Sequence, residues 1–261
     1  MDTVLSGLSA SLARVRVTMC YAVIVTAVTA AMVNMEPGVH DALIRHASTN
    51  LHNLSHGRVG TLVGSAFVVD AGPIYVWLPG LICLLAAAEL LWGSGRLLVA
   101  FAAGHIGATL VVAAGLAAAV RLGWMSVSVA HAPDVGMSYG AIAVLGTLTT
   151  AIPLRWRPAW VGWWLAVGAV VIALGRDFTD VGHTVAMVLG MAVATRFGEP
   201  RRWTPLRRVL LGVGAAFAYA VLADSVDALV PVTAAGAVGA LIGGCAYSLR
   251  RSVPRVDVRV G

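Results

Sequence analysis

The chain has 261 residues, of which 59% are hydrophobic and only 11% are charged. Roughly half of the residues of a soluble domain are apolar, so this composition excludes a soluble enzyme and indicates an integral membrane protein. All 18 basic residues are arginine, and the formal net charge is +6, which in a soluble protein would suggest nucleic acid as a partner. The placement of the arginines, described below, favours a topological explanation, with the lipid bilayer and not nucleic acid as the partner.

Eight apolar stretches approach the roughly 20 residues that a helix needs to cross a bilayer. They lie at about 17–33, 73–92, 97–120, 135–154, 159–175, 181–195, 209–223 and 229–249. We therefore expect an all-α polytopic membrane protein. The first stretch could instead be a signal peptide, because Arg14 and Arg16 precede it and small residues near Thr29 resemble a cleavage site.

The arginines divide unequally between the two sides that these spans define. The N-terminus, the tail and the loops on their side hold 14 of them, and the opposite loops hold four: Arg45, Arg58, Arg121 and Arg176. Arginine-rich segments remain in the cytoplasm, so both termini are expected to be cytoplasmic, with a bacterial plasma membrane as the expected location. The three cysteines, Cys20, Cys83 and Cys245, are scattered singly, so no disulfide framework, zinc site or other cofactor is expected.

The loop over residues 34–72 is long and lies on the outer side. It contains four histidines and the apolar piece 59–69, which is too short to span and suits an interfacial or partly inserted element. His52 and His56 are four residues apart and could share one face of a helix, a spacing that suggests a metal-binding site. Without a carboxylate or cysteine to complete a ligand set, interfacial polar residues are the favoured interpretation.

Polar groups inside membrane spans are costly and therefore mark functional candidates. Ser138 and His183 both lie about one helical turn below the outer surface, on the fourth and sixth spans. A histidine that accepts the proton of a serine makes that serine a nucleophile, so the pair could perform acyl transfer on a peptide bond. The alternative is that the serine hydroxyl bonds to its own backbone or joins two helices.

Small residues near both side chains predict that the two spans approach closely. Gly136 and Gly140 flank Ser138, and a stripe that begins with Gly182, Ala186 and Gly190 accompanies His183. Small residues at four-residue spacing permit close contact of helix backbones.

Three segments resemble the rhomboid superfamily. Glu89 in ELLWGSGRLL matches an acid that precedes Gly-Ser and a basic residue, GMSYGAIAVLG resembles the serine motif, and DVGHTVAMVLG resembles the histidine segment of the sixth helix. The resemblance implies a six-helix core over residues 1–196, with the outer loop at 34–72 gating lateral entry. Two further helices and an Arg-rich tail would then occupy 197–261.

By the same resemblance, Ser138 would be the nucleophile and His183 its base in an intramembrane serine protease whose substrate is a membrane protein. Two positions depart from the family pattern. Tyr139 follows the serine where active members usually have glycine, and residues 73–77 lack the family's His-x-x-x-Asn pair, which leaves Tyr75 as a possible donor to the oxyanion. Losing one such donor costs about 3 kcal/mol. The alternative is therefore an inactive relative that binds a client helix.

Other polar residues allow other interpretations. His105, on the third span, is expected to be a buried histidine bonded between helices. Glu89 could pair with Arg96 across a turn. A transporter would also place polar groups in the membrane, but the sequence has no evident inverted repeat and no carboxylate in the middle of a span.

Overall fold

The computed structural model describes residues 13–70, 72–175 and 177–252, and in these ranges every regular element is a helix. The α-helices are α2 (Arg16–Val33), α3 (Pro37–Ala47), α4 (Leu51–Ser55), α5 (Thr61–Gly64), α6 (Ile74–Trp92), α7 (Ser94–Arg121), α8 (Ser138–Thr147), α9 (Arg157–Gly175), α10 (Phe178–Ala194), α11 (Pro205–Ala223) and α12 (Val226–Ser252). Four short 3-10 helices accompany them: η1 (Ala13–Val15), η2 (Ser65–Phe67), η3 (Val127–His131) and η4 (Leu148–Ala151). The expected all-α class is confirmed.

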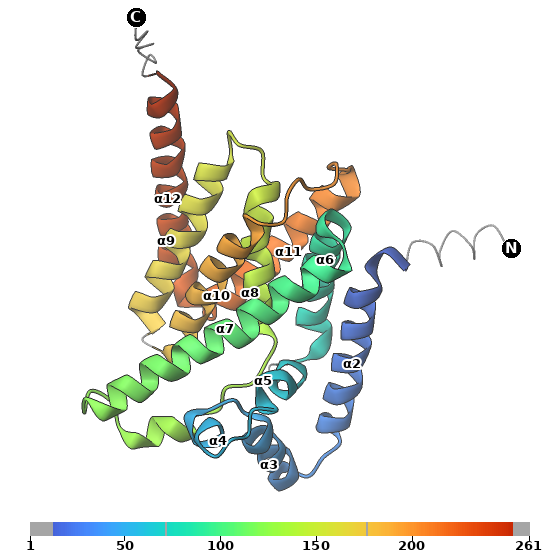
Figure 1. Cartoon of the computed structure of the whole chain (residues 1–261), viewed down its shortest axis with the longest axis vertical. Coiled ribbons are helices and arrows are strands. Elements are labelled where there is room, and N and C mark those ends of the chain that lie inside the picture. Colours follow the sequence, from blue (N-terminus) through green and yellow to red (C-terminus); the bar gives the residue numbers. More distant parts are fainter. Residues whose placement is uncertain (1–12, 71, 176, 253–261) are drawn as a thin grey trace, which may run out of the picture.

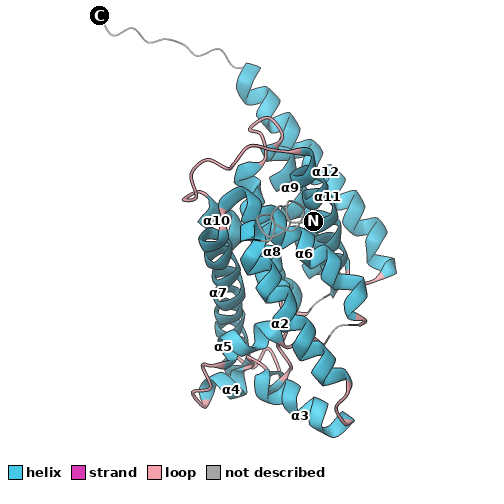
Figure 2. Ribbon diagram, turned by 90° about the vertical axis from the view of Figure 1, so that its right-hand side faces the viewer, coloured by secondary structure: helices cyan, strands magenta, loops and turns pink. Residues whose placement is uncertain are grey.

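Within the described ranges, six helices are long and apolar enough to cross a membrane: α2 with η1, α6, α7, α9, α11 and α12. α10 is apolar but shorter. The short helices α3, α4 and α5 gather at one end of the molecule (Figures 1 and 2). At the opposite end α2 begins and α12 ends, so the described chain crosses between the two ends an even number of times (Figure 1).

The fourth span is shorter than its 20-residue prediction, which was wrong in length. Gly136, which precedes α8, has a φ of +119°. A helix cannot continue through this backbone conformation, which favours glycine, so α8 begins only after it. After residue 147 the helix tightens into η4 and stops before Pro153, which has no N–H to continue it. All residues from Tyr139 to Thr147 are buried, because α6, α7, α10 and α11 surround α8. A helix enclosed by protein does not need to match the bilayer thickness.

Small residues bring α8 and α10 into backbone contact. A Cβ added at Gly190 would lie 2.0 Å from the carbonyl oxygen of Ala143, and one at Gly146 would lie 2.3 Å from that of Met187. No heavier side chain fits at such distances. The predicted close approach of the two spans is confirmed, but neither glycine beside Ser138 makes it: Gly136 lies outside the helix, and Gly140 packs against Phe101 of α7.

The last two helices pack against α6 and α9. Phe217 of α11 fills the space above Gly80 of α6, where an added Cβ would lie 2.4 Å from the Phe217 Cβ. α12 crosses α9 where Gly162 and Gly239 meet backbone to backbone. α11 therefore lies next to α6, α8 and α9 at once.

A buried carboxylate joins α2 to α6. Glu89 is 0% exposed and accepts hydrogen bonds from the backbone N–H groups of Val17 and Thr18, at 3.0 and 2.9 Å. The hydroxyls of Thr18 and Ser94 also donate to it, each at 2.7 Å. The first N–H groups of a helix have no partner within the helix, so the carboxylate caps α2. This contact makes α2 part of the packed core, which favours a span over a signal peptide. The expected ion pair between Glu89 and Arg96 is not found among the described residues, so that interpretation was wrong.

Candidate functional site

Ser138 is the first residue of α8, and its side chain is half-buried. The turn before it is held by the outer loop, because the Gly136 N–H donates to the Ser65 carbonyl at 2.9 Å. Gly140, two residues after Ser138, makes room for the Phe101 ring of α7, because a Cβ at Gly140 would lie 2.5 Å from that ring. The two glycines around Ser138 thus serve a turn and a helix contact.

His183 lies on α10 with only 6% of its surface exposed. Neither of its ring nitrogens has a hydrogen-bond partner within the described residues, so Ser138 does not donate to it. The Tyr139 ring lies edge-on against the imidazole instead, with centroids 5.2 Å apart and planes at 83°. Gly182 makes room for this ring, because a Cβ there would lie 2.3 Å from the tyrosine hydroxyl oxygen. The residue that departs from the family pattern is therefore the one that contacts the histidine.

The outer loop is hydrogen-bonded to the segment that precedes α8. Asp134 donates its N–H to the Ser48 hydroxyl at 2.7 Å, and its carbonyl accepts from the Thr49 N–H at 2.9 Å. The apolar piece predicted as partly inserted forms α5 and η2, which contact α7 and α2. The segment before α8 is thus fixed to the outer loop by backbone hydrogen bonds.

Two carboxylates, those of Asp134 and Asp177, dominate the electrostatics at the ends of α8 and α10 where Ser138 and His183 lie. Burial, together with the negative charge of the neighbouring Asp177, raises the pKa of Asp134 to about 6. Asp177 caps α10, where its side chain accepts from the Thr179 N–H. Negative groups near Ser138 would disfavour the oxyanion that forms in acyl transfer, which needs hydrogen-bond donors or positive charge.

The start of α6 carries neither residue of the His-x-x-x-Asn pair. Pro73 occupies the N-cap of α6 and has no N–H, and the Tyr75 side chain is 77% exposed. Trp77 is buried. None of the hydrogen bonds found among the described residues links Tyr75 to Ser138 or His183.

Two histidine groups lie elsewhere. His52 packs against His56 and also against His131 of η3, with ring centroids 4.3 and 4.5 Å apart, a partner that the sequence spacing did not indicate. No group of three potential ligands in the described ranges is arranged to hold a metal ion. His105 is buried and contacts the Ser65 hydroxyl at 3.1 Å, so it is bonded between elements as expected.

These features define a polytopic helical membrane protein in which a serine and a histidine lie at the same end of two tightly packed inner helices. The chain belongs to the rhomboid-like protein family, whose family model matches residues 10–199. No curated protein and no solved structure matches the chain significantly. The matched region ends before α11, so α11 and α12 lie outside it.

Proposed function

We propose that this chain binds transmembrane segments of other membrane proteins without cleaving them, in a plasma membrane and with both termini cytoplasmic. The observation that carries the proposal is the contact of Tyr139 with His183, in which the imidazole has no hydrogen bond to Ser138. A serine without a base within hydrogen-bond reach remains a poor nucleophile.

Access to Ser138 supports the same proposal. The rest of α8 is buried among four helices, and the segment before Ser138 is hydrogen-bonded to the outer loop. Both features restrict the approach of a peptide bond to the half-buried hydroxyl. The carboxylates near Ser138 and the missing His-x-x-x-Asn pair at the start of α6 lower the expected rate further.

A groove beside the site offers a place for the client segment. It has a volume of about 420 Å³ and lies between the outer halves of α7, α9 and α10. Its lining is apolar except for Asp177 and includes Gly115 and Ala119 at four-residue spacing on α7. A Cβ at Gly115 would meet no atom within 4 Å, so this small strip is free for the close approach of another helix.

Cleavage by an intramembrane serine protease is the second candidate function. It is favoured by the positions of Ser138 and His183 at the same end of α8 and α10, two helices in backbone contact. A change in the Tyr139 rotamer would be required before the pair could meet.

Association in liposomes tests the proposal. A panel of fluorescent single-span peptides with small-residue faces is expected to bind the wild type and Ser138→Ala equally and to remain intact by mass spectrometry. Gly115→Leu is expected to weaken binding about tenfold, because a leucine at the contact prevents close packing. Gly212→Leu is the matched control, since Gly212 also faces open space. Cleavage that requires Ser138, or equal binding by both leucine variants, would contradict the proposal.

A further inference from the structure

Three arginines from separate segments meet at the end of the molecule where α2 begins. Arg14 lies on η1, Arg201 lies in the loop between α10 and α11, and Arg207 lies in the first turn of α11. The backbone N–H of Arg201 donates to the carbonyl of Leu91 at 3.1 Å, and its guanidinium borders Gly93, where an added Cβ would lie 3.9 Å from Nη2. η1 contacts the same helix, α6. Both segments are therefore anchored at the C-terminal end of α6.

Arg207 is the most buried of the three. Only 6% of its surface is exposed, and the positive charges of Arg14 and Arg201 act on its guanidinium. Among the described residues its side chain donates one hydrogen bond, from Nη1 to the carbonyl of Arg202, although a guanidinium has five N–H donors. Burial of a charge is costly unless the charge is paired and hydrogen-bonded, so this guanidinium favours a negative partner.

No carboxylate in the described ranges forms an ion pair with any of these arginines. Glu89 already accepts four hydrogen bonds, from α2 and Ser94, and Glu199 is exposed. The retention of arginines on one side of a membrane explains why they occur at this end, but it does not require three of them to meet or one to be buried. The group therefore carries positive charge that no described carboxylate neutralises.

The depth of the group in the membrane indicates which anion reaches it. α11 is a candidate span that begins at Pro205, so Arg207 lies within one turn of the start of an apolar helix. Lipid phosphates lie at this level, at the edge of the hydrocarbon core. The N-terminus of α11 adds partial positive charge, and a guanidinium can donate two parallel hydrogen bonds to one phosphate.

We infer that these three arginines bind the phosphate of an acidic phospholipid, in the leaflet at which α11 begins. Arg14 and Arg201 are exposed and would contact the phosphate from η1 and from the loop, while Arg207 would contact it from α11. A soluble phosphate compound has the same chemistry without acyl chains, so inorganic phosphate is the comparison. The inference concerns lipid binding and does not rest on the proposed function.

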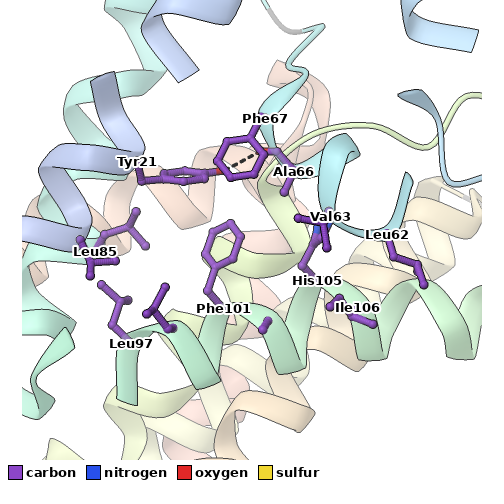
Figure 3. Close-up of a pocket in the computed structure, with 13 residues that line it drawn as sticks. Tyr21, Leu62, Val63, Ala66, Phe67, Leu85, Leu97, Phe101, His105 and Ile106 are labelled. Atoms are coloured by element: carbon purple, nitrogen blue, oxygen red, sulfur yellow. Dashed lines mark hydrogen bonds between the residues drawn. The ribbon is translucent and has the colours of Figure 1, made fainter. Parts of the chain in front are cut away.

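The cavity between α2, α5, η2, α6 and α7 is not part of this site (Figure 3). It has a volume of about 160 Å³, and its lining has no accessible polar atom. The hydroxyl of Tyr21 donates to the Ala66 carbonyl, and His105 contacts the Ser65 hydroxyl. A lipid head group has no partner there, so its affinity is expected to depend on the arginines.

Titrations of the full-length protein in detergent test the inference. Dioleoylphosphatidylglycerol, dioleoylphosphatidylcholine and inorganic phosphate are added separately, and each dissociation constant is taken from the concentration dependence of the melting temperature. The wild type is expected to bind the phosphatidylglycerol about tenfold more tightly than the phosphatidylcholine, because the choline group brings a positive charge to the arginines. Inorganic phosphate, which has no acyl chains, is expected to bind more weakly than either lipid.

Removal of the exposed charges is expected to weaken this binding. Arg14→Gln and Arg201→Gln should each weaken phosphatidylglycerol binding about fivefold, and the double variant about 25-fold, because each substitution removes one positive charge from the site. Both side chains are exposed, so the variants are expected to fold. Arg207 is less suitable, since it also holds the loop through the Arg202 carbonyl.

Arg155→Gln is the matched control, because Arg155 is exposed at the same end of the molecule, between η4 and α9. It is expected to bind phosphatidylglycerol as the wild type does. Equal affinity of the wild type for the two phospholipids, unchanged affinity in the double variant, or an equal loss in Arg155→Gln would overturn the inference. Tighter binding of inorganic phosphate than of phosphatidylglycerol would assign the site to a soluble phosphate compound and would overturn it as well.

Discussion

Glu89→Ala is expected to lower the melting temperature in detergent by about 10 °C. The substitution leaves the first N–H groups of α2 and the hydroxyls of Thr18 and Ser94 without their acceptor. Each buried donor left unpaired costs about 1–3 kcal/mol, and a chain of this size loses about 2–4 °C per kcal/mol. Loss of the cap would separate α2 from α6 and open the cavity that α2 lines.

Two further variants control this result. Glu89→Gln keeps one acceptor oxygen but places an amide donor against the other donors, so an intermediate loss is expected. Glu199→Ala removes an exposed carboxylate and is expected to leave the melting temperature unchanged. Similar melting temperatures for Glu89→Ala and Glu199→Ala would show that the carboxylate does not hold α2 in place.

Gly190→Leu is expected to be at least as damaging. A Cβ at this position would lie 2.0 Å from the Ala143 carbonyl oxygen, and a backbone atom cannot turn away as a side chain can. Overpacking of a close-packed interior costs about 1–3 kcal/mol and sometimes more. Because α8 and α10 would have to separate, the variant is expected to lose its single peak in size-exclusion chromatography or to melt about 10 °C lower.

Gly212→Leu is the matched control, because a Cβ at Gly212 meets nothing within 4 Å. It replaces the same residue type in another apolar helix and is expected to keep the wild-type elution profile and melting temperature. If both leucine variants behaved alike, the tight contact between α8 and α10 would not be what stabilises this part of the fold.

The sequence predicted the helices better than the site. Long apolar runs and the small-residue stripe of α10 were sufficient to predict the spans and the close contact of α8 with α10. The length of α8 was missed because its start follows the positive φ of Gly136 and its end tightens into η4 before Pro153, and an enclosed helix carries no signal of bilayer thickness.

The side-chain contacts in the site depend on rotamers and on segments far apart in the chain. Equal depth suggested that Ser138 and His183 could meet, but depth carries no information about Tyr139, which takes the place beside the imidazole. The departure at Tyr139 was the one signal in the sequence that pointed to this arrangement. The contact of Ser65 with His105 was likewise missed, since it joins an outer-loop segment to the middle of α7.

Reactivity of Ser138 toward a fluorophosphonate is the measurement that tests most directly whether this serine is activated. The purified protein is labelled in detergent and in liposomes, beside Ser138→Ala, His183→Ala and a catalytically competent rhomboid. We predict that the competent rhomboid reacts while the wild-type chain reacts no more than Ser138→Ala. Labelling of the wild type that is lost in both Ser138→Ala and His183→Ala would contradict the proposal and establish a working serine and histidine pair.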